Sequence, residues 1–591
     1  MAVERDFNDI LEDIFVHEDT AHKNSFEEGF KAGKEAGNPE GYHLGYHRGA
    51  ELGKELGFYL GTVIYHINTN DSSEAKYSAK ILNQLTKVKE LIETFPRTNS
   101  EDHDILDMAE KIRAQYKKAC ALLKIPSNNP YDAGVHIDTI LSYLTPLLPL
   151  ANCHMVEFLS HNHWETLLPT GLRETLDAMD IEEAVEKFWS CQSGVCDNSP
   201  LSLWVREAQS HCLSVNDEYC LSVDQLERRI KARGGVLPPE IPVKEFMNPK
   251  KSYEVRIMSR LLSSLYNTLD ASCSLEAGGG RGHLFVTASR GYRLRCLTVD
   301  CDQRTLTSAE ERGKLIQKQW HAISKTGKID VAETEKLHRF AQLFVTEHTD
   351  LVGVVKDNFP EIDGVDIRVL LTGLHTCGNL GPDSLRIFAT QPGTCAVFNV
   401  PCCYHLLTEE TDGALFDVFQ RNYEDEGTKK GFPMSDHLRG FNLGRNARML
   451  AAQSAERVLA HRAVPARSLL HRAVLQVIIK KHRPDLSLAE GRLKRAAKCH
   501  DFEEYFKMAD KILNLDLYGT LPASYLTDVD CQWKNMVLFY LIRLCLAQVI
   551  ESLILLDRLL FLRENGFSHV YLVKLFDPVL SPRCHSIVAM R

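Results

Sequence analysis

The alternation of apolar and polar positions predicts helices over much of the chain. Residues 135–245 have a helical, apolar composition punctuated by aromatic residues, and they end in the proline-rich stretch GGVLPPEIPV at 234–243, which is typical of a linker. An amphipathic helix follows within MNPKKSYEVRIMSRLLSSLYNTLD at 247–270. Residues 410–550 are again largely helical.

Short apolar runs between these helices predict a parallel sheet. Cys273–Ala277 is the first run and a second one ends at Asp300. Two further runs lie within 366–381 and 394–407, and a less distinct strand is expected at Gln342–Thr346. Such runs between helical segments indicate an α/β fold.

The last part of the chain predicts how this sheet is completed. Residues 553–591 have the pattern helix, strand, turn, strand, which predicts an antiparallel hairpin at the edge of the sheet. The sheet is then discontinuous in sequence, because the helical residues 410–550 precede its last two strands.

The first predicted strand leads into an acid and a glycine cluster, Glu276-x-Gly278-x-Gly280-x-Gly282, followed by a helix. Strand, glycine turn and helix form a nucleotide-cofactor site, because glycines let a ligand lie against the turn and the helix amino terminus favours polar ligand atoms. Asp300 ends the next strand, where an acid can bind ribose hydroxyls. The glycine spacing differs from that of dinucleotide sites and no Walker lysine follows, so we predict S-adenosylmethionine as the cofactor.

Histidines and cysteines follow two later strand ends, which should lie on the same edge of the sheet as the glycine turn. The candidate catalytic residues are His375, Cys402, Tyr404 and His405. We expect them to shape the acceptor pocket, with His375 or Tyr404 positioning the acceptor or taking its proton. Cys402 as a nucleophile is a second hypothesis. Two further hypotheses are that these residues bind a metal ion and that the cysteines have a purely structural role. The candidate metal ligands are His375, Cys377, Cys402, Cys403 and His405.

Charge and composition limit the partners and the compartment. The net charge of −10 argues against indiscriminate nucleic-acid binding, so any RNA contact is expected to be local, at the basic residues 461–498, for which a solvated helix face is the alternative. The acidic amino-terminal residues do not resemble a signal peptide, and charge-free stretches are shorter than the roughly 18 residues that span a bilayer. We expect a cytoplasmic or nuclear protein with reduced cysteines and no membrane contact.

Glycine recurs at every fourth position from 29 to 61, interleaved with aromatic residues. In a helix this spacing forms a stripe without side chains that another backbone can approach closely. Because each glycine costs about 1 kcal/mol relative to alanine in a helix, a partner or a folded-back segment of the chain must stabilise this helix. A flexible linker, the alternative, usually lacks such a period.

This repeat, FEEGFKAGKEAGNPEGYHLGYHRGAELGKELGFYLG, resembles that of the Yae/Lto adaptor family, also called oral-cancer-overexpressed protein, and the resemblance covers about residues 5–125. It implies a partner protein with a like glycine repeat, bound at residues 29–61, and a role in cytosolic iron–sulfur protein maturation. Family members commonly end in a tryptophan, whereas this chain ends in Ala589-Met590-Arg591.

A second resemblance covers about residues 140–591. LEAGGGRGHL, GLHTCGNLGPDSLRIF, VPCCYHLLTEE and FPMSDHLRGFNLGRNARMLAAQ are similar to stretches of the family of methyltransferase-like protein 25 and its B-type relatives, some labelled ribosomal RNA adenine dimethylase domain-containing. The resemblance implies a class I, Rossmann-like fold dependent on S-adenosylmethionine. Adenine-N6 enzymes carry an Asn/Asp-Pro-Pro-aromatic run at the fourth strand, where this chain has His375-Thr376-Cys377-Gly378. The HxCG and CCYH stretches also resemble a tRNA ribose-methylating family.

Together these observations predict a methyltransferase of RNA or protein that carries an all-α adaptor module. A catalytically inactive adaptor in iron–sulfur protein maturation or ribosome biogenesis is the alternative, and two merged neighbouring genes are a third reading. The expected segments are a glycine-repeat adaptor module at 1–125, a helical extension and linker at 135–245, a class I methyltransferase core at 246–409, a helical insertion at 410–550, and a closing helix with two strands at 551–591.

Overall fold

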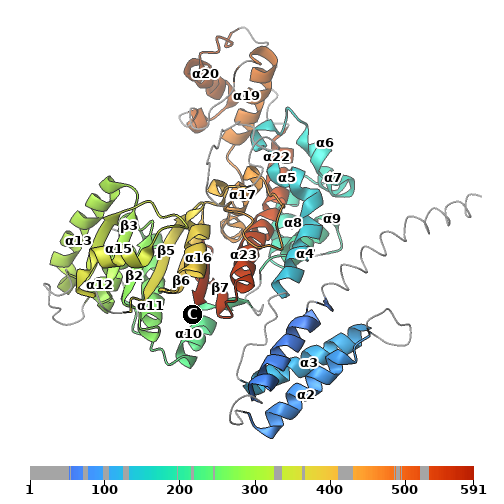
Figure 1. The fold of residues 1–591 in the computed structure, drawn as a ribbon. Coiled ribbons are helices and arrows are strands. Elements are labelled where there is room, and N and C mark those ends of the chain that lie inside the picture. The colour runs from blue at the N-terminus through green and yellow to red at the C-terminus, as the bar shows by residue number, and fades with distance from the viewer. Residues whose placement is uncertain are drawn as a thin grey trace, which may run out of the picture. The chain divides into compact units, whose positions relative to one another are not determined.

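The chain forms two compact units, Met1–Asp132 and Ala133–Arg591, which are described separately. The computed structural model (Figure 1) describes residues 52–53, 55–70, 77–96, 105–123, 132–195, 197–213, 219–241, 243, 247–324, 336–362, 366–409, 430–484, 486, 493, 496–519 and 532–591. The first six of the nine glycines, from Gly29 to Gly49, lie outside these residues, so the structure does not test that part of the predicted stripe.

In the first unit, residues 55–70 form a helix that packs against α2 (Ala79–Glu93) and α3 (Ile105–Leu123). Tyr59 stacks on Tyr116 with 4.0 Å between the ring centroids. The core residues of this unit are Leu56, Tyr59, Val63, Leu85, Val88, Ile92, Ile112, Tyr116, Ala119 and Cys120. The glycines do not belong to this core, because a Cβ added at Gly53, Gly57 or Gly61 would meet no atom within 4 Å.

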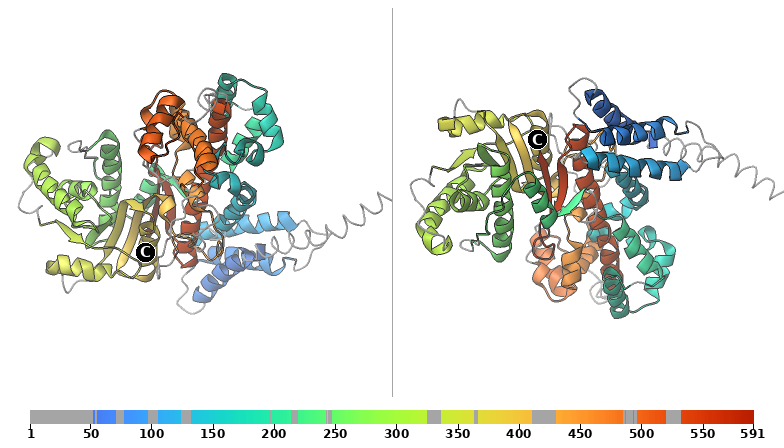
Figure 2. Two further views of the ribbon diagram at one scale, coloured as in Figure 1. Left: turned by 90° about the horizontal axis from the view of Figure 1, so that it is seen from above. Right: turned by 90° about the horizontal axis from the view of Figure 1, so that it is seen from below.

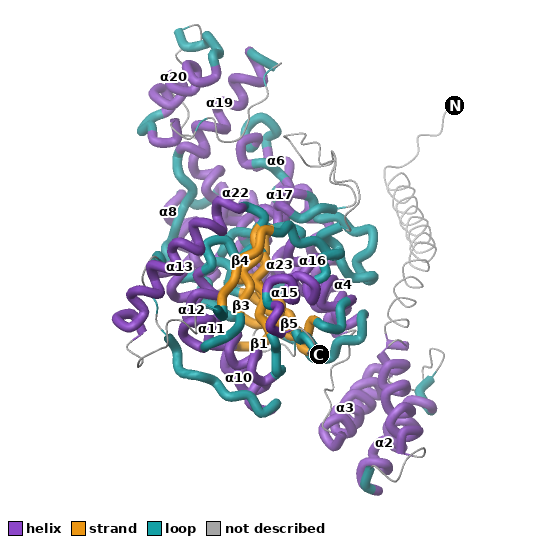
Figure 3. Tube along the Cα trace, turned by 60° about the vertical axis from the view of Figure 1, so that its left-hand side comes forward, coloured by secondary structure: helices purple, strands orange, loops and turns teal. Residues whose placement is uncertain are grey.

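The second unit is built on an eight-stranded sheet with the order β1-β7-β8-β6-β5-β2-β3-β4. The strands are β1 (Cys220–Ser222), β2 (Cys273–Ala277), β3 (Cys296–Asp300), β4 (His338–Gln342), β5 (Val369–Cys377), β6 (Thr394–Cys402), β7 (Val570–Lys574) and β8 (His585–Met590). Only the pairings of β8 are antiparallel among these described strands. Figure 3 shows the strands surrounded by helices.

The sheet confirms the predicted closing hairpin, since β8 pairs antiparallel with both β7 and β6. The prediction for β4 was wrong in its limits, because the strand is His338–Gln342 and the chain leaves the sheet where Gln342–Thr346 was expected. β1, which pairs parallel with β7, was not predicted. A strand of three residues between helices leaves too short a pattern to recognise.

Helices cover both faces of the sheet (Figure 2). On one face, α10 (Val223–Ala232), α11 (Pro249–Thr268) and α12 (His283–Tyr292) share an apolar core with the strands. On the other face, α15 (Leu351–Asn358), α16 (Leu380–Thr390) and α23 (Leu546–Glu564) do so. α13 (Gln303–Ser324) packs beside α12, where Ile316 contacts Val286.

A helical body extends from α23 and combines residues from both ends of the second unit. Its other helices are α4 (Asp132–Leu144), α5 (Leu148–Asn152), α6 (His163–Leu167), α7 (Thr170–Asp177), α8 (Ile181–Gln192), α9 (Pro200–Ser210), α17 (Arg445–Ala451), α18 (Ala455–Ala460), α19 (Ser468–His482), α20 (Phe502–Leu513) and α22 (Trp533–Leu544). The Trp204 indole donates to the Ile542 carbonyl, and the Arg543 guanidinium donates to the carbonyls of Leu150 and Ala151. The segments 135–245 and 410–550, separate in sequence, therefore pack together.

One stretch, Trp533–Glu564, is long and apolar enough by length and composition to cross a membrane. However, 89% of its most apolar window is buried inside the protein, where α22 and α23 form the centre of the helical body. This burial is typical of the core helix of a soluble domain, and one such stretch is weak grounds for a membrane span.

Candidate functional site

The candidate site lies along one edge of the sheet. Because β2, β3, β5 and β6 are parallel, their carboxyl ends meet there, and Cys377 and Cys402 are direct register partners. Glu276 and Asp300 end or nearly end their strands on the same edge. The residues divide into a cofactor half at the ends of β2 and β3, and an acceptor half at the ends of β5 and β6.

The cofactor half is a backbone turn that only glycine adopts readily. Gly278, Gly280 and Gly282 have φ of 65°, 54° and 66°, in the left-handed region. The Gly280 N–H donates to Asp300 Oδ2 at 3.0 Å, and Asp302 N–H donates to Oδ1 of the same carboxylate at 3.0 Å. The predicted cofactor residues therefore lie together, with Asp300 linking the ends of the two strands.

The turn is crowded on one side and open on the other. A Cβ at Gly278 would lie 2.8 Å from Leu380 Cδ2, and one at Gly279 would lie 2.6 Å from Thr298 Cγ2. At Gly280 an added Cβ would meet nothing within 4 Å. Gly280 therefore borders the space in which a ligand can approach the backbone.

Glu276 is buried with an unsatisfied oxygen. Its side chain is 3% exposed, and Oε2 has no hydrogen-bond partner among the described residues. Burial raises the pKa of Glu276 to about 8, the Lys251 charge opposes the shift, and the Asp300 charge adds to it. A buried polar atom without a partner is costly, and one beside an open glycine turn fits the binding of a polar ligand. These residues therefore fit a nucleoside cofactor.

The acceptor half contains a second buried carboxylate, Glu254 on α11, which the sequence analysis missed. Glu254 accepts from Ser581 Oγ at 2.7 Å and lies 2.9 Å from Lys251 Nζ and 3.2 Å from His375 Nε2. Burial disfavours its charge, but the hydrogen bond with His375 and the charge of Lys251 outweigh this and hold the pKa of Glu254 well below its usual range.

The signal for Glu254 was present in the sequence but weak. It lies on the buried side of α11, where it is the one charged residue among apolar residues and serines. Because charged residues are seldom fully buried unless they are paired, the sequence implied that this residue has a partner but did not identify that partner. Ser581, in the segment between β7 and β8, carried no comparable signal.

Three of the predicted metal-ligand candidates come together. The sulfur atoms of Cys377, Cys402 and Cys403 lie within 4.8 Å of one another, with 3.1 Å between Cys377 Sγ and Cys402 Sγ. The two predicted histidine ligands do not join this group: His375 bonds to Glu254, and His405 follows in a short 3-10 helix, Tyr404–Leu406.

Tyr404, a predicted catalytic residue, is buried and its hydroxyl is already hydrogen-bonded within the protein. Its side chain is fully buried, and its hydroxyl donates to Glu551 Oε1 at 2.9 Å. The guanidinium of Arg558 lies 5.8 Å from the centre of its ring. In this arrangement the hydroxyl of Tyr404 is engaged inside the protein, next to the end of β6, whereas His375 is partly exposed.

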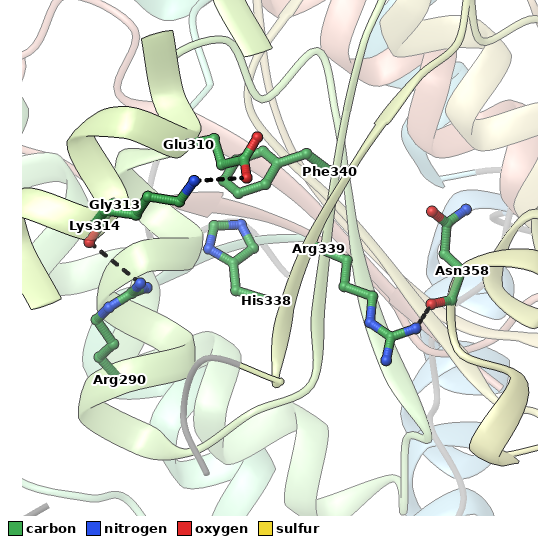
Figure 4. Close-up of a pocket in the computed structure, with 8 residues that line it drawn as sticks. All are labelled: Arg290, Glu310, Gly313, Lys314, His338, Arg339, Phe340 and Asn358. Carbon is green, nitrogen blue, oxygen red and sulfur yellow. Dashed lines mark hydrogen bonds and ion pairs between the residues drawn. The ribbon is translucent and has the colours of Figure 1, made fainter. Parts of the chain in front are cut away.

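A cavity of about 480 Å³ lies beside β4 (Figure 4). It is close to the glycine turn, because a Cβ added at Gly282 would lie 3.3 Å from Phe340 Cε1. It is lined by Arg290, Glu310, Gly313, Lys314, His338, Arg339, Phe340 and Asn358. His338 and Phe340 point toward the α12 and α13 residues, while Arg339 points toward Asn358. Burial lowers the pKa of His338 to about 3, so its ring is neutral. None of the predicted cofactor or catalytic residues lines this cavity.

The basic segment 461–498 is partly engaged within the protein. Arg462 forms an ion pair with Glu186, Arg467 lies over the Trp533 ring, and Lys480 pairs with Glu157. These contacts leave fewer cations for phosphate groups than the sequence suggests. Several basic residues of the segment lie outside the described part, and RNA binding there stays a prediction.

Comparison with known proteins shows that this chain is similar to methyltransferases. Residues 250–410 match a family model described as a methyltransferase domain. A mouse protein named "Probable methyltransferase-like protein 25" is 27% identical over 578 residues, covering 76% of this chain and 95% of the mouse protein. The human protein of that name is 26% identical over 588 residues, covering 76% of this chain and 96% of the human protein.

These similarities agree with the geometry. The matched range contains the glycine turn, Asp300, Glu254, His375 and the three cysteines. The mixed α/β sheet is consistent with a class I methyltransferase fold, and the similarity to these relatives supports a methyltransferase. The resemblance of the amino-terminal repeat to the Yae/Lto family stays a prediction.

Proposed function

We propose that the second unit is a methyltransferase dependent on S-adenosylmethionine, with an RNA or protein acceptor. The observation that carries this proposal is the left-handed glycine turn, in which Gly280 borders open space. The Oε2 atom of Glu276, which has no hydrogen-bond partner in the described part of the chain, lies 3.0 Å from the position of a Cβ at the neighbouring Gly279. Gly278, Gly280 and Gly282 would lie against the cofactor, with Glu276 and Asp300 as its polar partners. When bound, the cofactor supplies an electrophilic methyl group.

The acceptor half is suited to removing a proton. Because Glu254 is ionised, its oxygen can only accept, so the Nε2 of His375 must carry the proton in their hydrogen bond. In the neutral form of this ring, Nδ1 is the unprotonated nitrogen and can take a proton from an acceptor. Glu254 orients the imidazole, as buried carboxylates do for catalytic histidines. His375, at 30% side-chain exposure, is accessible to such an acceptor.

The test is calorimetric titration of S-adenosylmethionine into the full chain. Gly280→Arg should weaken binding at least about 10-fold, or roughly 1.4 kcal/mol, because the new side chain fills the cofactor space. Gly440→Arg is the matched control, since Gly440 also has positive φ, 84°, and no atom within 4 Å of an added Cβ. Equal binding by both variants would remove the glycine turn from the cofactor site.

A second function is favoured by the uncovered glycines of the first unit. Gly53, Gly57 and Gly61 carry the four-residue repeat and have no atom within 4 Å of an added Cβ, so the stripe is open to a second helix. We infer that it binds a protein with a like glycine repeat, as an adaptor would. Gly57→Leu should abolish capture of such a purified protein, whereas Lys87→Leu, at an exposed residue of α2 outside the stripe, should not. Capture by both variants would contradict this role.

A further inference from the structure

The three thiols at the end of β5 and β6 form a cluster that methyl transfer by His375 does not use. Cys377 is exposed, Cys403 is half-buried and Cys402 is buried, so the cluster reaches the surface from the core. Two of the thiols come from neighbouring strands, as Cys377 and Cys402 are register partners in a parallel pair.

The third thiol, that of Cys403, lies close to the other two because the backbone at Cys403 is not extended. Neighbouring side chains in a strand point to opposite faces, so Cys402 and Cys403 would diverge in extended backbone. Cys403 instead has φ of 41°, in the left-handed region that non-glycine residues rarely occupy. Strain of this kind persists where the surrounding structure holds it, and it is concentrated at functional sites.

The spacing and charges suit a thiophilic metal ion. Zinc binds thiolates at about 2.3 Å in a tetrahedron, which places the sulfur atoms about 3.8 Å apart. This value lies between the 3.1 Å separating Cys377 and Cys402 and the 4.8 Å limit of the cluster. The Cys403 thiol also lies within the electrostatic field of the Arg583 guanidinium. A nearby cation favours the thiolate, which is the form of cysteine that binds metal.

We propose that Cys377, Cys402 and Cys403 bind Zn²⁺ through three thiolates. Three thiolates and one Zn²⁺ carry a net charge of −1, which the positive charge of the Arg583 guanidinium offsets. Three protein ligands leave a fourth position for water or a ligand, as in catalytic zinc sites, and the exposed side of Cys377 gives access to it. This proposal rests on the thiol geometry and not on the proposed methyl transfer.

The test measures zinc directly. The full chain, reduced with a phosphine and dialysed against zinc, should retain about one ion per chain by mass spectrometry of the metal. Replacement of zinc by Co²⁺ should give a thiolate-to-cobalt charge-transfer absorption. Cys377→Ser should weaken binding at least about 10-fold and remove most of this absorption. Because Cys377 is exposed, this variant should fold, and circular dichroism verifies that it does.

Cys499→Ser is the control, as Cys499 is also accessible but lies outside the cluster. It should retain zinc and the cobalt absorption. The proposal is overturned if the reduced wild-type chain retains no zinc, or if Cys377→Ser retains as much as the control. A Cys377–Cys402 disulfide in the untreated chain, with no zinc uptake after reduction, would identify the cluster as a redox pair instead.

Discussion

Each half of the sheet edge contains a buried acidic residue, and the pKa values of these two residues are shifted in opposite directions. Glu276, in the cofactor half, is buried with an unsatisfied oxygen, and burial raises its pKa to about 8. Glu254, in the acceptor half, is equally buried, but His375 and Lys251 hold its pKa well below the usual range. The cofactor half therefore contains a buried acid with an oxygen that is unpaired among the described residues, whereas the acceptor half contains a paired ionic network.

The two halves also differ in the interactions that position their residues. In the cofactor half, the local backbone positions the residues through the left-handed glycines and the Gly280–Asp300 hydrogen bond. In the acceptor half, residues far apart in the sequence position one another, because Glu254 on α11 bonds to His375 and to Ser581, which precedes β8. Removing a charge should therefore affect stability more in the acceptor half.

The largest effect is expected for Glu254→Gln. It leaves Lys251 and His375 beside a buried neutral amide, and breaking a buried ion pair costs about 3 to 5 kcal/mol. Because both partners are partly exposed, we expect the lower end of this range in the free energy of unfolding measured with denaturant. Glu310→Gln is the control: Glu310 pairs with Lys314 on the surface, and its loss should cost less than about 1 kcal/mol. Similar costs for both variants would contradict the network.

Glu276→Gln should change the pH dependence of stability. Because the folded-state pKa of about 8 is above the usual value of 4.5, the folded chain holds this proton more tightly than the unfolded chain. Its contribution is full below pH 4.5 and is lost as the pH rises through 8. We expect wild-type unfolding free energy to fall by up to about 1.4 kcal/mol per pH unit in this window from Glu276 alone. Glu276→Gln should lack this slope, and an unchanged slope would contradict the assignment.

Tyr404→Phe should have the smallest effect. It removes one hydrogen bond to Glu551 and should lower the free energy of unfolding by about 1 to 2 kcal/mol, without weakening S-adenosylmethionine binding. Tyr540→Phe provides the comparison, because its hydroxyl makes only a 3.4 Å contact with Gln453. If Tyr404→Phe destabilised the chain no more than Tyr540→Phe, the hydroxyl would not stabilise the fold through Glu551.

The cofactor half could be predicted from sequence because its parts are contiguous. Glu276 and the three glycines fall within seven positions, and Asp300 ends the next strand, so a local pattern identifies them. β4 was misplaced because its sequence, HRFAQ, lacks a clear apolar run.

The acceptor half could be predicted only in part. His375 and the cysteines were visible as strand ends, but their partners come from residues far away in sequence, such as Glu254, Ser581 and Glu551. A single sequence contains no signal for such pairings. The convergence of Cys403 with the other thiols depended on a left-handed backbone at a cysteine, which no propensity indicates.

The central claim is that one half of the edge binds the cofactor and the other half serves the acceptor. The most direct measurement compares S-adenosylmethionine binding by Asp300→Ala with binding by His375→Ala, using calorimetry on the full chain. We predict that Asp300→Ala, which removes the partner of Gly280, loses at least about 10-fold in affinity, whereas His375→Ala binds as wild type does. Equal losses in both variants, or a loss confined to His375→Ala, would contradict this division of the edge.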